Sequence, residues 1–198
     1  MKPVSTELDA INTMLSVIGE APVNTLTGTL PADVALAYNT LEEVTREVQL
    51  TGWHFNTEEN YPLLPKPGSG EIHLPANVVE VTLIDPDSRD IVQRGRKLYD
   101  RANHTYKFTE TVEASILSVL PFDELPEVFR WYVTVRASRK FQDKAVGSSE
   151  QHGYTAEDER HARAGAVASD MQCARPSAAK GNAASFISGW TVGKVLER

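Results

Sequence analysis

The sequence predicts an α+β protein. We expect an antiparallel helical bundle built from the N- and C-terminal helices, an inserted antiparallel β-domain, and an extended C-terminal tail. Apolar residues recur three and four positions apart near both ends of the chain, but from Trp53 to Leu120 they alternate with polar ones. Turn sequences, not helices, separate the short apolar runs of this middle region, which favours an antiparallel meander.

Two helices are expected before Gly52. The first spans 5–18, with Ser5 or Thr6 as its N-cap. Its apolar stripe is Leu8, Ile11, Leu15 and Ile18. The second runs from about Pro31 to Leu50, because proline is favoured in a first helical turn and Gly52 ends the pattern. Its buried stripe is Val34, Tyr38, Leu41, Val44 and Val48, and its solvated face is Glu42, Glu43, Arg46 and Glu47.

Short strands are expected in the middle region. Val79, Val81 and Leu83 alternate with polar residues, and a turn is expected over 85–90. Further strands are predicted over 91–99, 105–108 and 114–120, with a second turn over 100–104 between the first two.

Two more helices follow. The first is expected within 121–147, with Asp123 as its cap and Pro126 in its first turn. The second begins near Thr155 with a capping box completed by Asp158. Small residues form its expected contact face: Ala162, Ala166, Ser169 and Cys173.

These elements give a discontinuous organisation. Residues 1–52 and 121–175 are expected to form the helical bundle, and residues 53–120 the inserted β-domain. Residues 176–198 are expected to be a linker followed by an apolar C-terminal tail, because 174–185 carry no periodic signal.

Composition narrows the class of protein. The 198 residues suffice for one domain with an insertion, and no apolar run approaches the roughly 20 residues of a membrane span. We expect no secretion signal, and the single cysteine, Cys173, leaves no intrachain disulfide, so a reducing cytosol is the expected site of synthesis. The formal net charge of -7 disfavours a dedicated DNA-binding protein, because phosphate binding depends on Lys and Arg.

No catalytic, cofactor or metal site is expected. Glu58 and Glu59 are neighbours, so on a strand their side chains point to opposite faces. A glycosidase needs two carboxyls on one site, and the possible partners in space are Glu71, Asp85, Asp87 and Asp90. We instead expect Trp53 and Phe55 to enter the core where the helices meet the β-domain.

Two segments are candidate interfaces. Arg136, Arg139, Lys140 and Lys144 gather near the C-terminal end of their helix, where cations favour the helix dipole. They form a solvated face, a salt-bridge face for another protein, or a DNA contact. The tail residues Phe186, Ile187, Trp190 and Val192 form either a docking arm or a cover that folds back on the bundle.

Several phrases resemble one family. They are IGEAPVNTL (18–26), GWHFNTEE (52–59), LLP (63–65), LYDR (98–101), DELPEVFRWYVTVRASRKFQ (123–142) and FISG (186–189). Their content, order and spacing resemble tail tubular protein A, the adaptor or gatekeeper of short-tailed bacteriophages. Residues 66–97 and 150–183 show no clear family phrase.

The resemblance implies a structural role in the virion tail, after synthesis in the host cytoplasm. Such adaptors form a ring, usually of twelve copies, that joins the portal to the tail nozzle, tail tubular protein B, and helps to anchor tail fibre protein. DNA passes through the ring only as cargo, and no membrane contact, cofactor or enzymatic activity is implied. Twelve copies would carry 12 × -7 = -84 formal charges, and an acidic channel would repel DNA phosphates.

Two other classes of function stay open at this point. One is a virion-associated, polysaccharide-cleaving enzyme that uses paired carboxylates. The other is a nucleic-acid-binding module.

Overall fold

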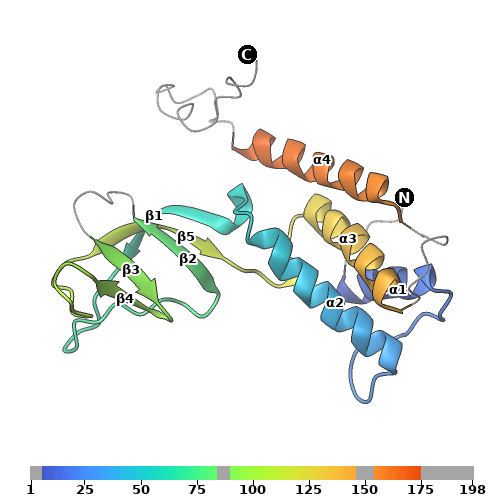
Figure 1. Ribbon diagram of the computed structural model, residues 1–198, viewed down its shortest axis with the longest axis horizontal. Helices are drawn as coiled ribbons and strands as arrows, with labels where there is room; N and C mark the ends of the chain where they lie inside the picture. Colours follow the sequence, from blue (N-terminus) through green and yellow to red (C-terminus); the bar gives the residue numbers. More distant parts are fainter. Residues whose placement is uncertain (1–5, 84–89, 146–153, 175–198) are drawn as a thin grey trace, which may run out of the picture.

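The computed structural model describes residues 6–83, 90–145 and 154–174. Helices occupy one half of the molecule and strands the other (Figure 1). The helices are α1 (Glu7–Val17), α2 (Ala32–Gln49), α3 (Glu127–Ala145) and α4 (Ala156–Cys173). The strands are β1 (Thr57–Leu63), β2 (Val78–Leu83), β3 (Ile91–Arg94), β4 (Lys97–Asp100) and β5 (Val112–Ser118). Two short 3-10 turns are η1 (His54–Asn56) and η2 (Phe122–Glu124), and the α+β class is confirmed.

The capping predictions hold for α1 and α4. The Thr6 hydroxyl accepts a hydrogen bond from the Asp9 backbone N–H, which satisfies one free donor of the first turn of α1. At α4, Thr155 and Asp158 form the predicted reciprocal capping box. Pro31 is the N-cap of α2, one residue earlier than the expected first turn.

The start of α3 differs from the prediction. Asp123 lies in η2, and α3 begins only at Glu127. Leu125 is extended, with ψ of 147°, because a residue before proline is disfavoured in the helical region. The Asp123 carboxylate instead accepts a hydrogen bond from the Glu7 backbone N–H at 2.9 Å, which connects η2 to the beginning of α1.

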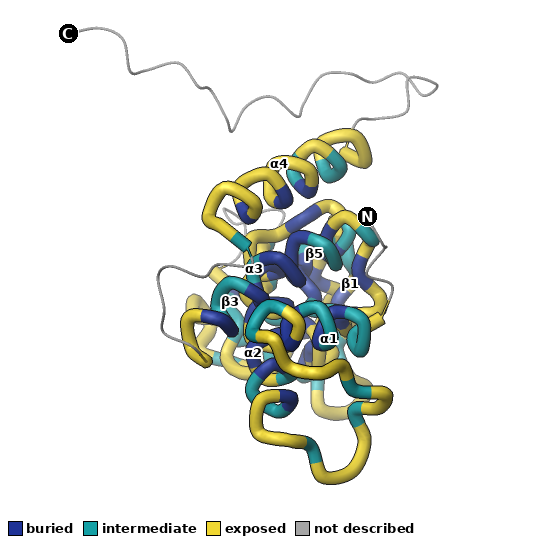
Figure 2. Tube along the Cα trace, turned by 90° about the vertical axis from the view of Figure 1, so that its right-hand side faces the viewer, coloured by how far each residue is buried: buried dark blue, intermediate teal, exposed yellow. Residues whose placement is uncertain are grey.

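One apolar core joins the four helices, and α3 contacts each of the other three. The core includes Ile11, Met14, Leu41, Val44, Phe129 and Phe141. Helix α4 contributes mainly Ala162 and Ala166, and Figure 2 shows its buried residues turned toward α3. Two members of the expected α4 contact face differ: Ser169 is half-buried and Cys173 is exposed. At that end α4 lies over η1, since the Asp170 carboxylate accepts from the His54 backbone N–H at 2.7 Å.

The sheet is antiparallel, but the meander prediction is wrong. Strand β5, the last in the sequence, lies in the centre of a three-stranded sheet with the order β1-β5-β2. Strands β3 and β4 form a separate antiparallel hairpin. Most positions of the central β5 are buried, and both of its edges pair with neighbouring strands. Alternation in sequence identifies strands but does not select their neighbours.

The expected strand over 91–99 is interrupted by a two-residue turn. Arg94 pairs with Lys97, and Gly95 has a φ of +62°, a conformation that glycine adopts without steric cost. This arrangement is typical of a type II′ hairpin turn. The predicted strand over 105–108 forms only isolated bridges, and most of the turn predicted over 85–90 lies outside the described residues. The turn predicted over 100–104 is present.

A second apolar core lies within the β-strand half. It consists of Leu63, Ile72, Leu74, Val78, Ile91, Leu98, Phe108, Val112, Ala114 and Ile116. These side chains come from all five strands, from the segment before β2 and, for Phe108, from the segment between β4 and β5.

Buried amides connect the two halves. The Gln49 side chain, fully buried at the end of α2, donates to the Leu120 carbonyl at 2.9 Å and accepts from the Leu120 N–H at 2.8 Å. The Asn56 side chain donates to the carbonyls of Gln49 and Ser118, each at 3.0 Å. The chain that leaves α2 is thereby fixed to the chain that leaves β5.

Aromatic packing supports the same junction. Trp53 is buried, and its ring lies 4.9 Å from that of Phe129 on α3. Phe55 is half-buried, with its ring 4.6 Å from Phe129. The prediction that Trp53 and Phe55 enter the core is therefore confirmed, and Glu58 and Glu59 follow them as exposed residues of β1.

Candidate interface

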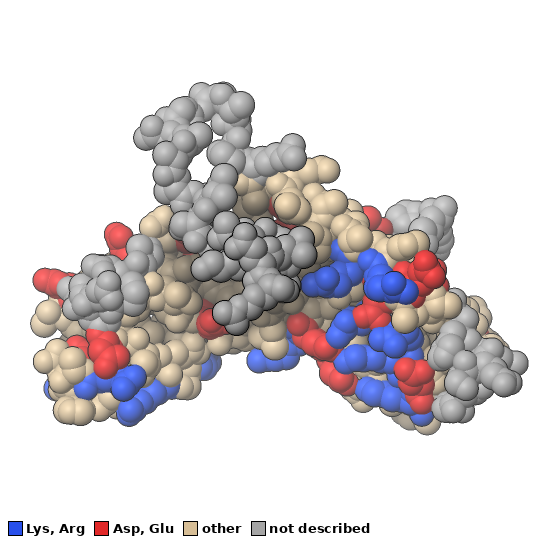
Figure 3. Space-filling model, turned by 45° about the horizontal axis from the view of Figure 1, so that its top comes forward, with Lys and Arg blue, Asp and Glu red and all other residues tan. Residues whose placement is uncertain are grey.

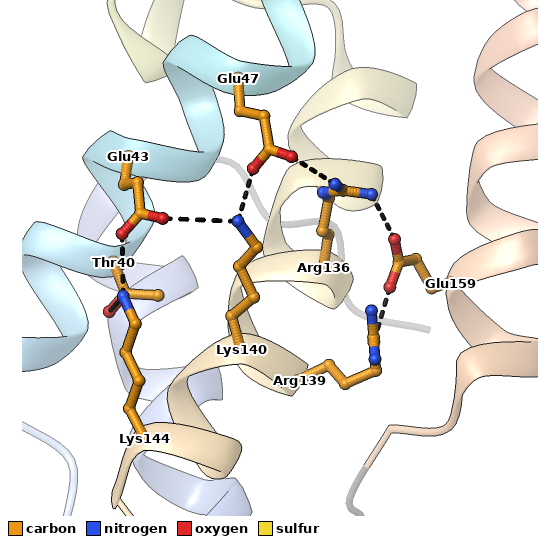
Figure 4. A network of polar contacts seen from close by, with 8 residues as sticks. All are labelled: Thr40, Glu43, Glu47, Arg136, Arg139, Lys140, Lys144 and Glu159. Carbon is orange, nitrogen blue, oxygen red and sulfur yellow. Dashed lines mark hydrogen bonds and ion pairs between the residues drawn. The ribbon is translucent and has the colours of Figure 1, made fainter.

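Seven charged side chains on three helices form one continuous network (Figure 4). Helix α2 supplies two carboxylates, α3 supplies the four predicted cations, and α4 supplies one carboxylate. The members are Glu43, Glu47, Arg136, Arg139, Lys140, Lys144 and Glu159. We call this set the helix charge network.

Helical spacing aligns the partners of α2 and α3. Glu43 and Glu47 lie four residues apart, so both side chains project from one face of α2. Glu47 accepts from Arg136 Nη2 and from Lys140 Nζ, each at 2.5 Å. Glu43 accepts from Lys144 Nζ at 2.8 Å and from Lys140 Nζ at 3.4 Å. The two helices are thus joined along two successive turns.

Glu159 extends the network to α4. Its carboxylate accepts from Arg136 Nη1 at 2.5 Å and from Arg139 Nε at 2.6 Å, and only 11% of its side chain is exposed. Arg136 is therefore shared between a carboxylate of α2 and a carboxylate of α4. The other buried residues of α4 are the small Ala162 and Ala166, so we expect this charged contact to help hold α4 against α3.

The electrostatics agree with this geometry. The hydrogen bond from Lys140 lowers the pKa of Glu47, although partial burial opposes the shift. The hydrogen bond from Lys144 lowers the pKa of Glu43. The network holds four cations and three carboxylates, so its formal sum is +1. Figure 3 shows the basic and acidic side chains interleaved over the helical half.

Sequence reasoning found the cations of the network but missed their partners. Glu43 and Glu47 were expected on a solvated face, and they are exposed, but they also bind α3. Glu159 was not predicted at all, although it lies three residues before the predicted contact residue Ala162. The use of Arg136, Arg139 and Lys140 as an interface to another protein stays a prediction, and the structure shows these side chains occupied within their own chain.

The helix charge network gives stability a defined pH dependence. A carboxylate whose folded-state pKa is lowered stabilises the fold above its ordinary pKa of 4.5 and loses this effect as pH falls through the folded-state value. We expect Glu47→Gln to be less stable than the unmodified chain at pH 7, and the difference to shrink below about pH 4.5. Thermal unfolding at several pH values measures this, with Glu59→Gln on exposed β1 as the control. A difference that grows on acidification would contradict the assignment.

Removing the carboxylate of Glu159 should loosen α4. We expect Glu159→Gln to cost about 1–3 kcal/mol, because two partly buried arginines lose a charged acceptor. Hydrogen exchange should accelerate in α4 before it does so in α3, and the loss should be smaller at high salt. Glu157→Gln, whose side chain is 68% exposed on the same helix, is the matched control. If hydrogen exchange in α4 did not change, the contacts of Ala162 and Ala166 alone would be enough to hold α4 against α3, and the prediction would be wrong.

Two of the carboxylates considered for catalysis, Glu71 and Asp90, lie beside basic side chains. Glu71 binds Lys97 and His73, and the hydrogen bond from Lys97 lowers its pKa. Asp90 lies 3.5 Å from Arg101, while Asp85 and Asp87 lie outside the described residues. A hollow of about 200 Å³ at the helix–sheet junction has one carboxylate, Glu80, in its lining. A glycosidase site needs two.

Three further observations concern the described part of the chain. No group of three or more His, Cys, Asp or Glu residues there is arranged to hold a metal ion. None of the described helices is long and apolar enough to cross a membrane. The predicted docking residues Phe186, Ile187, Trp190 and Val192 lie outside the described residues, so their role stays a prediction.

Comparison with known proteins identifies the family. The tail tubular protein family matches residues 8–176, which include both the helices and the strands. The chain is also similar to "Tail tubular protein A" of Klebsiella phage KP34, with 30% identity over 156 residues. The matched region covers 78% of this chain and 82% of that relative. The chain therefore belongs to the tail tubular protein family, and it is a structural protein of a phage tail, not an enzyme.

Proposed function

We propose that this chain is the ring-forming adaptor that joins the portal to the tail nozzle of a short-tailed phage. The observation that carries the proposal is the extent of the family match: it spans residues 8–176 and agrees with a relative that is named tail tubular protein A. Twelve copies would surround the channel, with tail tubular protein B below, tail fibre protein at the junction, and DNA as passing cargo.

The proposed division of labour follows the two cores. The helices (1–52 and 121–175) act as one antiparallel bundle that supplies ring and portal contacts. The β-domain (53–120) forms part of the lower face. The helix charge network supports this role, because it joins α2, α3 and α4 into one unit.

The apolar tail is the proposed portal-docking arm. Residues 176–198 follow α4 in the sequence and include Trp190 among aliphatic residues. Tryptophan is a frequent anchor of protein interfaces because it buries a large rigid surface.

Mass measurement in solution tests both proposals. The full-length chain, a truncation after Arg175, and Trp190→Ala are each measured alone and with the portal of the same phage. We expect the full-length chain to add a mass of twelve copies per portal, and the truncation and Trp190→Ala to add less. A full-length chain that never joins the portal would refute the adaptor role. A truncated chain that joins equally well would refute only the docking arm.

A further inference from the structure

The cations of the β3–β4 hairpin differ from those of α3. Every cation of the helix charge network contacts a carboxylate, whereas Arg94 and Arg96 have no ion pair with the described residues. The guanidinium of Arg94 lies 3.7 Å from the centre of the Tyr99 ring, and Arg96 donates to the Leu74 carbonyl at 3.3 Å. Both arginines are exposed at the two-residue turn. Their positive charge is therefore held in place but not neutralised.

Two lysines enlarge this charge. Lys97 pairs with Arg94 across the hairpin, and isolated bridges connect Lys97 to His73 and Lys107 to Glu71. Within the described residues, Glu71 is the one carboxylate that contacts this group, through Lys97. We call Arg94, Arg96, Lys97 and Lys107 the basic hairpin surface; with Glu71 included, its formal charge is +3. Figure 3 shows basic side chains gathered on the strand half, apart from those of the helices.

The helical half carries a surface of opposite sign. Glu7 on α1, Glu42 on α2 and Asp123 in η2 come together, although they are far apart in the sequence. None of the three forms an ion pair with a cation in the part of the chain that the structure describes. Burial raises the pKa of Glu7, and the neighbouring charges of Glu42 and Asp123 add to this effect. We call these three residues the acidic helix surface; its formal charge is -3.

The two surfaces lie in opposite halves of the molecule, since α1 and α2 belong to one half and the β3–β4 hairpin to the other (Figure 1). One copy therefore cannot satisfy its own hairpin with these carboxylates. The carboxylates of a second copy can pair with the hairpin. The contact is then heterologous, because each copy contacts one neighbour through its hairpin and the other neighbour through its helices. Such head-to-tail contacts close into rings when the rotation between copies permits.

We propose that the basic hairpin surface of one copy docks on the acidic helix surface of a second copy. Two observations favour a second copy as the partner. The formal charges of the two surfaces, +3 and -3, are complementary, and the net charge of -7 gives each neighbouring copy a predominantly acidic exterior. The contact rests on the proposed function, because it assigns the surfaces by which the ring closes. Complementary charges of this kind set the orientation and the rate of association and make both sensitive to salt.

Charge reversal on the hairpin is the first step of the test. Arg94→Glu/Arg96→Glu is compared with the unmodified full-length chain for assembly on the portal, by mass measurement at low and high salt. We expect the reversal to weaken ring assembly by about tenfold or more, and the assembly of the unmodified chain to weaken as salt rises. Arg160→Glu/Arg163→Glu makes an equal charge change at two exposed arginines outside the basic hairpin surface, and it should weaken assembly less than the hairpin reversal does.

Reversal on the opposite surface supplies the rescue. Glu7→Lys/Glu42→Lys alone should also weaken assembly, whereas the chain that carries both reversals should recover much of it. Glu42→Lys alone replaces the double change if the helices fail to fold, as judged by thermal unfolding. Rescue would be absent if the two surfaces met different partners, and that result would overturn the proposal.

The assembly measurements and a DNA titration distinguish a failure of this proposal from a failure of the adaptor role, and from binding of nucleic acid by the hairpin. If the unmodified chain never assembles with the portal, the proposed function fails with it. If the unmodified and hairpin-reversed chains assemble equally well, only this proposal fails. A 30-base-pair DNA duplex is titrated with both chains as a further probe. A hairpin reversal that abolishes DNA binding but leaves assembly intact would identify nucleic acid as the partner and overturn the proposal.

Discussion

Phe129→Ala is expected to destabilise the chain by about 3–5 kcal/mol, the cost of emptying a large aromatic site in a packed core. Phe129 is 2% exposed and contacts Trp53 and Phe55, which lead from the end of α2 into β1. The substitution therefore removes packing contacts from the helical core and from the junction between the two halves. The melting temperature should fall by roughly 6–20 °C in a chain of this size.

Thermal and denaturant unfolding, followed by tryptophan fluorescence, measure the effect of Phe129→Ala. Val128→Ala is the matched control, because Val128 is the preceding residue of α3 and is 38% exposed. It should change stability by less than about 1 kcal/mol. Equal melting of the two variants would mean that the aromatic contacts at the junction are not formed as described.

Gln49→Ala is expected to cost about 2–4 kcal/mol. The substitution leaves the N–H and C=O of the half-buried Leu120 without the side-chain amide that bonds both, and each group left unsatisfied away from water costs about 1–3 kcal/mol. Because Gln49 ends α2 and Leu120 follows β5, the substitution should destabilise the junction between the helices and the strands. Hydrogen exchange at the Leu120 amide should accelerate strongly.

Two companion variants isolate the cause. Gln49→Met nearly preserves side-chain volume but removes the hydrogen bonds, so we expect it to retain most of the destabilisation. Gln172→Ala removes an exposed amide near the end of α4 and should have little effect. If Gln49→Met were as stable as the unmodified chain, the volume of Gln49 rather than its hydrogen bonds would be what matters.

Helical elements could be predicted well from the sequence, because their signals are local. The caps Thr6 and Thr155 and the end of α2 before Gly52 follow from residues within one or two helical turns. The start of α3 was misplaced because Asp123 looked like a cap, whereas the residue before Pro126 resists the helical conformation. The restriction that Pro126 places on Leu125 is a local signal in the sequence for the later start of α3.

The strand order could not be predicted in the same way. Alternation located the region of β2 and of β5, but nothing local to β5 states that it lies between β1 and β2. The hairpin was a different case. Gly95 between Arg94 and Arg96 is a turn signal in a polar stretch with apolar residues on both sides, and it was missed because 91–99 was interpreted as one strand.

The ion-pair partners in the candidate interface also could not be predicted from local sequence signals. The sequence showed Arg136, Lys140 and Lys144 gathered near the C-terminal end of one helix, but their partners on α2 are 89 to 101 residues away. A single sequence does not indicate such distant pairs. The acidic helix surface is similar, because Glu7, Glu42 and Asp123 become neighbours only when α1, α2 and η2 pack together.

Cryo-electron microscopy of the virion that encodes this chain is the decisive observation for the adaptor role. We expect a ring of repeated copies of this fold around the DNA channel, between the portal and the nozzle. In this ring, the β3–β4 hairpin of each copy should lie against α1 and α2 of the next copy. Virions that lack the chain, or that carry it away from the channel, would contradict it.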